Sequence, residues 1–265
     1  MSDALYIAAT GMQAQQAGVD VIANNLANVN TTAFKRGRVG FADLMTREAM
    51  RVAGAIGASQ GAETSVQMQR MGAGVAMTGM GKVFDPGEIK KTDSPLDIAI
   101  RGEGFLEVTL ADGTHAYTRG GSLKVNRDGV LETQAGHALR PSISIPANAE
   151  SISIAADGRV TVRLANQASP VDAGQIDLYR FSNASRLEAM GDNLYRASEA
   201  SGEAIAGRPG EDGAGLFAQG FLEGSNVKMV DEMVNLMLAQ RAYEASVKVV
   251  QAADEMMGLV NNLRK

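Results

Sequence analysis

The chain has 265 residues, 45% of them hydrophobic, so it can bury a core and is not globally disordered. It contains no cysteine, which excludes disulfides, thiolate chemistry and cysteine-ligated metals. The net charge is −5 and no basic tract is longer than Lys35-Arg36 or Lys90-Lys91, so nucleic acid is not expected as a partner.

The first predicted element is a long helix over residues 4–34. Steps of three and four residues give a coiled-coil-like seam with seven apolar positions out of eight. The seam comprises Leu5, Ala8, Met12, Gln15, Val19, Ile22, Leu26 and Val29. The other faces carry Gln, Asn, Ala and Thr, with Asp20 as the one charge, so they do not read as a solvated surface.

The stretch VIANNLANVNTTAFKR (21–36) places Asn24, Asn25 and Asn28 in this helix, although Asn is a mediocre helix former. An amide can bond sideways to a neighbouring helix without desolvating a charge, and a polar interface residue can fix register. We therefore interpret the asparagines as packing groups between subunits. Fraying of the helix end is an alternative that accounts for Asn28 but not for Asn24 and Asn25.

Two Gly-rich regions have weak periodicity. Residues 52–81 are rich in Gly, Ala, Gln and Met and are predicted to form an extended arm, preceded by a short helix at 41–50. A second weakly structured stretch is predicted at 201–215. The methionines of the arm have no obvious core of their own, so packing on neighbouring subunits and ordinary core packing remain equal alternatives for Met68, Met71, Met77 and Met80.

Between the terminal segments the apolar pattern changes to a period of two. Each of 106–118, 122–133 and 151–164 places an Asp-Gly pair between two alternating runs. Asp-Gly is a preferred hairpin turn because Gly tolerates positive φ. Further strands are predicted at 176–181 and 214–223, so this region is expected to be a mostly antiparallel β domain.

The last predicted element is a helix that runs from an N-cap at Ser225 or Asn226 to about Leu263. One apolar series along it is Leu236, Ala239, Tyr243, Ser246, Val250, Ala253, Met257 and Val260. A neighbouring series is Ala242, Ala245, Val249, Ala252, Met256, Leu259 and Leu263. Two adjacent series make an apolar face wider than one partner helix can cover.

The predicted fold class is α+β: paired long N- and C-terminal helices in a coiled-coil-like core, an extended connecting arm, and a mostly antiparallel β domain. The parts are a terminal helical core (1–38 plus 224–265), the arm with connecting strands (39–93 plus 201–223) and the outer β domain (94–200). Ordering two isolated helices costs more free energy than their mutual burial recovers, so we expect other copies to cover the second apolar face.

This reasoning predicts a set of residues that pack between subunits. They are Leu5, Met12, Val19, Ile22, Asn24, Asn25, Leu26, Asn28, Phe34, Met233, Leu236, Tyr243, Val250 and Met257.

An enzyme is the main competing class. Ser59 lies in a G-x-S-x-G match, and Asp112 with His115, or Asp128 with His137, follows in hydrolase order. That motif needs a strand, a helix and a parallel sheet, whereas the surroundings are Gly/Ala-rich and tight hairpins follow. We therefore predict no catalytic, cofactor or metal site, and keep a serine hydrolase at Ser59 as a remote alternative. A third possibility is a monomeric adaptor with a helical-hairpin docking site.

Four segments resemble bacterial flagellar rod and hook proteins. GMQAQQAGVDVIANNLANVNTTAFKR (11–36) is similar to their amino-terminal signature, and GSNVKMVDEMVNLMLAQRAYEASVKVVQAADEMM (224–257) to their carboxy-terminal one. SPLDIAIRGEGFLEV (94–108) and AYTRGGSLKVNRDGVLET (116–133) resemble the start of their β domain. Ala33 departs from the pattern, which has Gly before Phe-Lys, and Ala resists positive φ.

The resemblance implies a helical tube of identical subunits with a core of paired terminal helices. The length and single β domain favour a subunit of the distal rod, with the proximal rod or another hook-family subunit as the alternative. The implied partners are proximal rod and hook subunits, the surrounding ring proteins and the flagellar export apparatus, with no cofactor. The implied location is the basal-body rod across the periplasm, reached by export without a cleaved leader; the sequence predicts no leader and no membrane insertion.

Overall fold

The structure is a computed structural model that describes residues 2–50, 68–165, 167 and 169–263. Its contacts divide the chain into two compact units, each described here by itself. The first comprises residues 1–23, 38–80 and 230–265, and the second residues 24–37 and 81–229. Within the described part of the chain, neither long helix contains a stretch apolar enough to cross a membrane.

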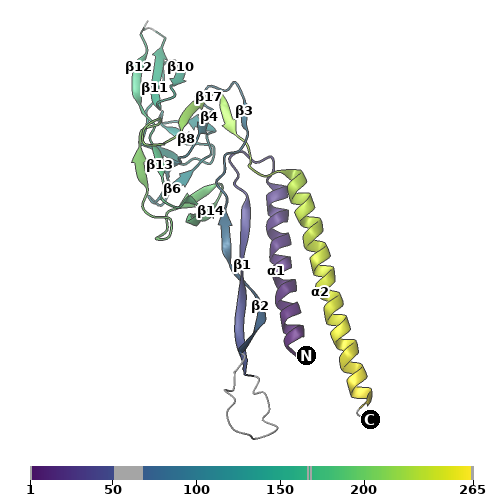
Figure 1. Ribbon diagram of the computed structural model, residues 1–265. Helices are drawn as coiled ribbons and strands as arrows, with labels where there is room; N and C mark the ends of the chain where they lie inside the picture. The colour runs from purple at the N-terminus through teal and green to yellow at the C-terminus, as the bar shows by residue number, and fades with distance from the viewer. Residues whose placement is uncertain (1, 51–67, 166, 168, 264–265) are drawn as a thin grey trace, which may run out of the picture. The chain divides into compact units, whose positions relative to one another are not determined.

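The first unit is built from two long helices and a two-stranded hairpin (Figure 1). The helices are α1 (Ser2–Ala27) and α2 (Met229–Leu263), and the strands are β1 (Gly37–Met50) and β2 (Met68–Lys82). The prediction of two long terminal helices is confirmed. The last turn of α1, from Asn24, and the first residue of α2 belong to the second unit.

Two glycines of the first unit lie where its elements come near each other, and one of them is required there. A Cβ added at Gly74, where φ is +110°, would lie 2.5 Å from the hydroxyl oxygen of Thr10, so only glycine fits there. The neighbouring amide of Val75 donates to that hydroxyl at 3.4 Å. A Cβ at Gly11 would lie 3.9 Å from Ser246 Oγ, an ordinary contact distance, so α1 and α2 are neighbours at that level without needing glycine.

Helix α1 is shorter than predicted: it ends at Ala27 instead of continuing to residue 34. Asn28 caps this end, because its Nδ2 donates to the Asn24 carbonyl at 2.9 Å and its Oδ1 accepts from the Thr31 hydroxyl. Turns follow, and Ala33 then adopts φ +58°, a value that no helix contains.

The short helix predicted at 41–50 is wrong, because these residues lie in β1 and pair with β2. Strand pairing supplies the backbone hydrogen bonds here, so tertiary context overrides local helix propensity. Of the predicted arm, residues 68–81 lie in β2 and residues 52–67 lie outside the described residues. The stretch 201–215 contains a short strand, β16 (Ile205–Gly207).

The N-cap prediction at Ser225 or Asn226 is also wrong, since α2 begins at Met229. The Asn226 side chain binds elsewhere: its Oδ1 accepts from the Arg36 amide at 2.7 Å and its Nδ2 donates to the Val83 carbonyl at 2.8 Å.

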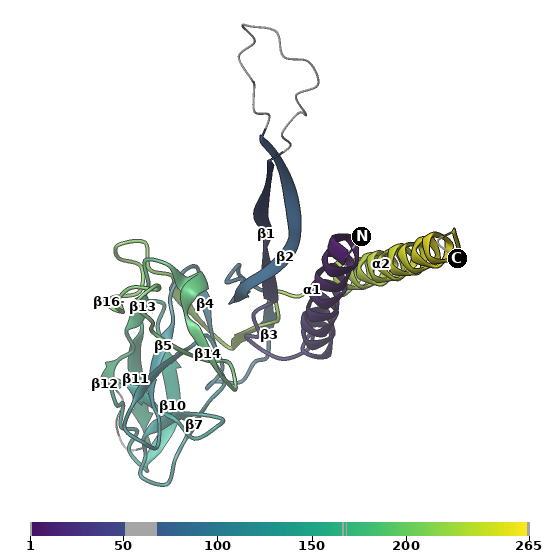
Figure 2. The same ribbon diagram turned by 90° about the horizontal axis from the view of Figure 1, so that it is seen from below.

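The second unit is the β domain with the segments that connect it to the helices (Figures 1 and 2). Its largest sheet has the order β14-β15-β6-β5-β9-β8-β7, and every strand pair in it is antiparallel. These strands are β5 (Leu106–Thr109), β6 (His115–Thr118), β7 (Leu123–Val125), β8 (Leu131–Thr133), β9 (Ala138–Arg140), β14 (Glu188–Gly191) and β15 (Leu194–Arg196).

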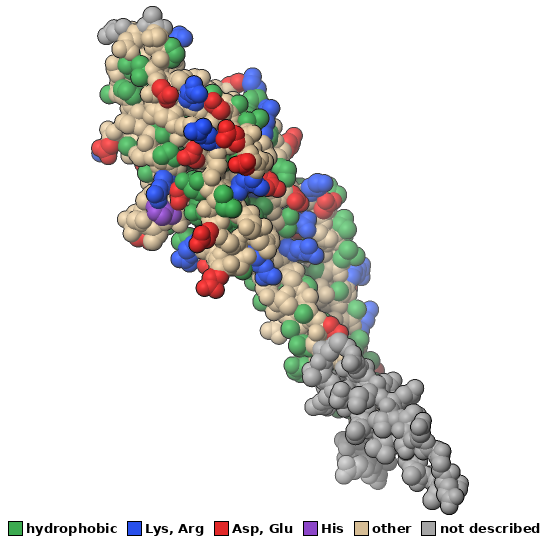
Figure 3. All heavy atoms as spheres, turned by 60° about the vertical axis from the view of Figure 1, so that its left-hand side comes forward, with side chains coloured by type: hydrophobic (Ala, Val, Ile, Leu, Met, Phe, Trp, Pro, Cys, Tyr) green, Lys and Arg blue, Asp and Glu red, His purple; other side chains and the backbone are tan. Residues whose placement is uncertain are grey.

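Smaller antiparallel sheets complete the unit. One has the order β10-β11-β12, and the others pair β13 with β16, β17 with β4 and β18 with β3. The strands are β3 (Ile89–Lys91), β4 (Ile98–Arg101), β10 (Ala149–Ile154), β11 (Arg159–Leu164), β12 (Val171–Gln175), β13 (Leu178–Arg180), β17 (Leu216–Gln219) and β18 (Phe221–Glu223). A 3-10 turn occupies Ala184–Arg186. Acidic and basic side chains are interspersed over the face shown in Figure 3.

The three hairpins predicted from Asp-Gly pairs are confirmed. They join β5 to β6, β7 to β8 and β10 to β11. Their glycines Gly113, Gly129 and Gly158 have φ of +80°, +79° and +83°. These are the left-handed values that make Asp-Gly a preferred hairpin turn.

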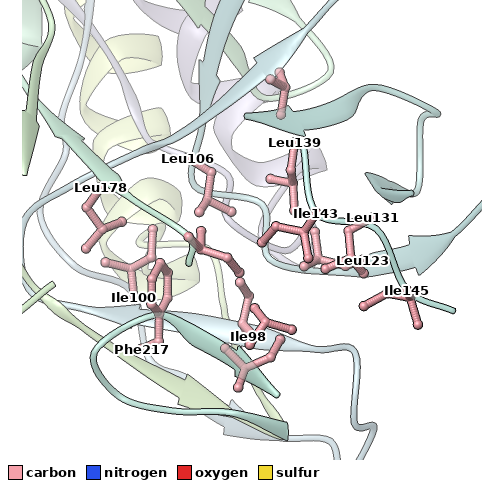
Figure 4. Packing of buried hydrophobic residues seen from close by; sticks show 14 of the residues in the cluster. Ile98, Ile100, Leu106, Leu123, Leu131, Leu139, Ile143, Ile145, Leu178 and Phe217 are labelled. Carbon is pink, nitrogen blue, oxygen red and sulfur yellow. The ribbon is translucent and has the colours of Figure 1, made fainter. Parts of the chain in front are cut away.

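The core of the second unit is aliphatic and fully enclosed (Figure 4). Leu106, Val108 and Leu131 are 0% exposed, and Ile98 and Ile100 pack with them from β4. A second cluster joins Phe105 and Tyr195 to Phe84 by edge-to-face contacts at ring-centroid distances of 4.9–6.2 Å. Both clusters are completed by residues of this unit alone.

One side-chain amide closes a strand edge in this unit. Gln219 Oε1 accepts from the Ile154 amide at 3.1 Å, and its Nε2 donates to the Ile152 carbonyl at 2.9 Å. These are the groups of β10 that face away from β11. The Gln219 amide thus takes the place of a neighbouring strand.

Candidate functional site: the terminal helices and their joint

The predicted seam of α1 is the more sheltered side of that helix. All eight of its positions, from Leu5 to Val29, are buried or half-buried. The residues between them are mixed: Tyr6 at 58% and Ile7 at 40% are exposed, whereas Ala14, Ala17 and Val21 are half-buried. The period of three and four residues therefore identified sheltered positions, but the sheltered surface of α1 is wider than this seam.

The two apolar series of α2 behave differently. In the first, the residues from Leu236 to Met257 are buried or half-buried, apart from Tyr243 at 44% exposure. The second series is open, with Val249, Met256 and Leu259 between 51% and 64% exposed. We define the exposed stripe as Val234, Leu238, Ala245, Val249, Ala252, Met256 and Leu259, which a 3.6-residue period places on one face.

The residues predicted to pack between subunits fall into three groups. Asn25 and Phe34 are buried, and Asn24, Met233 and Tyr243 are exposed. The half-buried ones are Leu5, Met12, Val19, Ile22, Leu26, Asn28, Leu236, Val250 and Met257. Their role between subunits stays a prediction.

Asn25 has partners within its own chain. Its Nδ2 donates to the Gly37 carbonyl at 3.0 Å, and its Oδ1 accepts from the Gly37 amide at 2.7 Å. The side chain thus pairs with both backbone groups of one residue, as a neighbouring strand would. Asn25 is 2% exposed, so these bonds are shielded from water and tie the last turn of α1 to the start of β1.

A buried ion cluster lies where the connecting segments of the second unit meet. Glu223, at the end of β18, accepts from Lys35 Nζ at 2.6 Å on Oε1 and from Arg119 Nε at 2.8 Å on Oε2. The side chains of all three residues are at most 3% exposed. The Gly87 amide also donates to Oε1, at 2.9 Å. We call these residues, with Asn25 and Asn226, the joint.

Other donors of the two cations are bound by backbone carbonyls. Arg119 donates to Gly104 at 2.9 Å and Gly102 at 3.0 Å, and Lys35 donates to Asp85 at 2.8 Å. A buried charge is tolerated when it is paired and hydrogen-bonded, and in this cluster every charged nitrogen has at least one acceptor.

The electrostatics favour an ionised carboxylate. Burial alone would raise the pKa of Glu223, but Arg119 and Lys35 outweigh it and hold that pKa below the usual value. Burial lowers the pKa of Lys35, and Glu223 opposes this shift. Because the same carboxylate pairs with both cations, loss of its charge would leave two buried positive charges without their shared counter-ion.

Backbone bonds and an aromatic contact reinforce the joint. The Ala33 amide donates to the Glu223 carbonyl at 2.8 Å. The side chain of Lys82 donates to the Lys35 carbonyl at 3.0 Å and lies 4.3 Å from the ring centroid of Phe34. Phe34, predicted as a subunit-packing residue, is thus 7% exposed within the single chain.

Sequence reasoning missed the joint because its partners are distant in the chain, Lys35 and Glu223 being 188 positions apart. A local signal did exist. Lys35 follows Ala33-Phe34 and Glu223 follows Phe221-Leu222, so each charge ends an apolar segment beside a turn.

The hydrolase alternative finds no assembled triad among the described residues. Ser59 lies outside them. The Asp112 carboxylate accepts from the backbone amide and hydroxyl of Thr114 at 2.9 and 2.6 Å, which is a turn contact. His115 Nε2 lies 2.8 Å from Arg140 Nη1.

Three family matches cover the helices and the β domain. Residues 5–35 match the family described as flagella basal body rod protein, and residues 218–263 match the flagellar basal body rod FlgEFG protein C-terminal family. Residues 99–162 match the flagellar hook protein FlgE/F/G D1 domain. The class defined by fold and matches is that of flagellar rod and hook axial proteins.

Full-length relatives indicate which members of this class the chain resembles. The flagellar basal-body rod protein FlgG of Caulobacter vibrioides is 44% identical over 98% of this chain and 99% of its own length. FlgG of Buchnera aphidicola subsp. Schizaphis graminum is 42% identical over 99% and 100%. FlgF of Caulobacter vibrioides is 32% identical over 98% and 100%. The chain therefore belongs to the flagellar basal-body rod protein family, and it is a structural subunit of that rod.

Proposed function

We propose that this chain builds the distal part of the flagellar rod by self-assembly into a helical tube whose core is made of α1 and α2. The observation that carries the proposal is the exposed stripe of α2, where Leu238 is 62% and Leu259 is 64% exposed. Apolar surface in such a continuous row is stabilised when another helix covers it. Identical subunits that cover one another's stripes make a heterologous contact, which can propagate as an open filament.

The polar face of α2 supports the same arrangement. Glu244, Lys248 and Glu255 flank one side of the stripe, and Arg241 at the same edge pairs with Glu244 at 3.2 Å. A helix with two apolar faces and one charged face can contact its own chain, a second copy and water at once. Such a helix suits a densely packed tube wall.

Within this proposal the rod transmits motor torque from the helical core to the hook. Its neighbours are other copies, proximal rod and hook subunits and surrounding ring proteins, and it reaches the periplasm through the flagellar export apparatus. The division into helical core, arm and outer β domain belongs to the same proposal. The distal position is supported by 44% identity to FlgG against 32% to FlgF of one organism.

Assembly of matched variants tests the proposal. Val249→Asp introduces a charge into the stripe, whereas Gln251→Asp introduces the same charge at an exposed polar position two residues away. We expect sedimentation and electron microscopy to show filaments for the wild type and Gln251→Asp, and none for Val249→Asp. All three monomers should have the same urea midpoint. Filament formation by Val249→Asp at the wild-type concentration would contradict the proposal.

The position within the rod has its own test. In Caulobacter vibrioides strains lacking either FlgG or FlgF, expression of this chain should restore motility to the first strain only. Restoration of the FlgF-deficient strain alone would assign the chain to the other rod segment.

A further inference from the structure

We propose that Glu223 is the positioning residue for assembly: its carboxylate holds the end of α1 and the start of α2 at one place in the folded β domain. The inference rests on the proposed function, because it concerns helices that are to enter a common core. It goes beyond that function by assigning the control of helix placement to one buried side chain.

Three other segments of the chain meet at the Glu223 carboxylate. Lys35 belongs to the segment that leaves α1, Gly87 to the segment that follows β2, and Arg119 to the β domain between β6 and β7. Glu223 itself lies six residues before α2 begins at Met229. One side chain therefore bonds to every connection between the helices, the hairpin and the β domain.

The helix ends are attached to the same place by two amides. Asn25, in the last turn of α1, binds both backbone groups of Gly37. Asn226, three residues before α2, binds the Arg36 amide and the Val83 carbonyl. The backbone between these contacts carries Lys35, so any displacement of Lys35 moves the anchor points of both helices.

Formation of the ion cluster of Glu223, Lys35 and Arg119 depends on the folded β domain. Arg119 is held by the carbonyls of Gly102 and Gly104, which lie between β4 and β5, so it is in place once these strands have folded. Glu223 then neutralises Arg119 and accepts Lys35. Without the carboxylate two buried cations would face each other, so the segment carrying Lys35 would detach to reach water.

Amide hydrogen exchange on the full-length monomer tests this positioning role without requiring assembly. The variant Glu223→Gln keeps the size and one acceptor but removes the charge. We expect exchange at Ala33, Gly87 and Asn226 to accelerate by about a hundredfold to a few thousandfold, the scale of losing one partner of a buried ion pair. The amides of Val108 and Ala116 in the β5–β6 pair should keep their protection.

Two further variants separate positioning from general stability. Glu188→Gln removes a charge from the exposed Glu188–Arg196 pair of the same domain and should change none of these amides. Glu223→Asp keeps the charge on a shorter side chain and should restore part of the protection. Equal loss at Val108 and Ala33 in Glu223→Gln would overturn the inference, since Glu223 would then only stabilise the fold. Unchanged exchange at Ala33 would overturn it as well.

Filament growth supplies the second readout. If the wild type assembles, Glu223→Gln should lengthen the lag and broaden the spread of subunit positions in filament images, while Glu188→Gln behaves as wild type. If the wild type does not assemble, the proposed function fails, but the exchange result still decides whether Glu223 holds the joint. Normal filaments from Glu223→Gln with a detached Lys35 segment would refute the positioning role.

Discussion

The β domain and the terminal helices treat apolar residues in opposite ways. In the β domain Leu106, Val108 and Leu131 are completely enclosed by residues of the same unit. On α2 the residues Leu238 and Leu259 are more than 60% exposed, although both are as apolar as the buried leucines. The β domain completes its packing within one chain, whereas the helices carry packing surface that one chain does not cover.

The free energy that stabilises each part therefore comes from different contacts. Burial inside the β domain stabilises the monomer at any concentration. Burial of the exposed stripe occurs only in contact with another molecule, so its contribution depends on protein concentration. A subunit that must stay separate before assembly and pack tightly afterwards needs both kinds of surface.

Leucine truncation should give the largest difference in stability between the β domain and the helices. Leu131→Ala removes a fully buried side chain and should lower the free energy of unfolding by about 2–5 kcal/mol. Leu238→Ala, at 62% exposure, should change it by about 0.5 kcal/mol or less in the monomer. Urea denaturation followed by near-ultraviolet circular dichroism measures both. Similar losses in the two variants would mean that the helices fold as part of the same core.

Gly74→Ala tests one of the close contacts that the helical unit does make. The new Cβ would lie 2.5 Å from Thr10 Oγ1 on a backbone with φ +110°, so the hairpin must shift away from α1 at a cost on the order of 2 kcal/mol. Exchange of the Val75 amide should accelerate while the β5–β6 amides stay protected. Gly72→Ala is the control, because its Cβ meets only one atom, at 4.0 Å. An unchanged Val75 amide would show that the hairpin is not held by this contact.

Acid should weaken the joint before it weakens the aliphatic core. The pKa of Glu223 is lower in the folded chain than in the unfolded one, so its contribution is complete above the usual Glu range. That contribution is lost as the pH falls through the folded pKa. Urea midpoints measured from pH 7 to pH 3 should therefore fall more for the wild type than for Glu223→Gln. Parallel curves would contradict the ionised carboxylate, and Glu188→Gln should follow the wild type.

Ala33→Gly should give the smallest effect, and a favourable one. Ala33 holds φ +58°, which costs roughly 1–2 kcal/mol for a residue with a Cβ. Glycine relieves this strain but loses about 0.5–1 kcal/mol of backbone entropy, so we expect a gain of about 0.5 kcal/mol. Thermal unfolding of the monomer measures it. A loss of stability would show that the buried methyl group packs usefully.

Features with a local cause were predictable from the sequence. The Asp-Gly turns need only two adjacent residues, and the seam of α1 needs only a repeat of three and four. The β1–β2 hairpin was not predicted, because its Gly, Ala and Met residues lack a period of two and its pairing is set by contact between distant segments. Ala33 is instructive: the departure from Gly identified the position where φ is in fact positive.

The joint shows why only part of the candidate site could be predicted from the sequence. Asn25 was singled out as unusual in a helix, and its environment is indeed special. Its partner Gly37 could not be named, because the turn that brings Gly37 back depends on Ala33 and on the Glu223 carbonyl beyond it. Packing residues follow a periodic rule, whereas a buried ion cluster depends on the complete fold.

The side-chain amide of Gln219 limits how strand β10 can pair with other molecules. In the proposed rod the β domains of many copies would lie close together, and an open strand edge would invite sheets of different subunits to fuse into an aggregate. Gln219 occupies the Ile154 amide and the Ile152 carbonyl of β10. A foreign strand could pair there only by displacing it. At these two backbone groups the β10 edge is therefore closed to a strand of a neighbouring subunit.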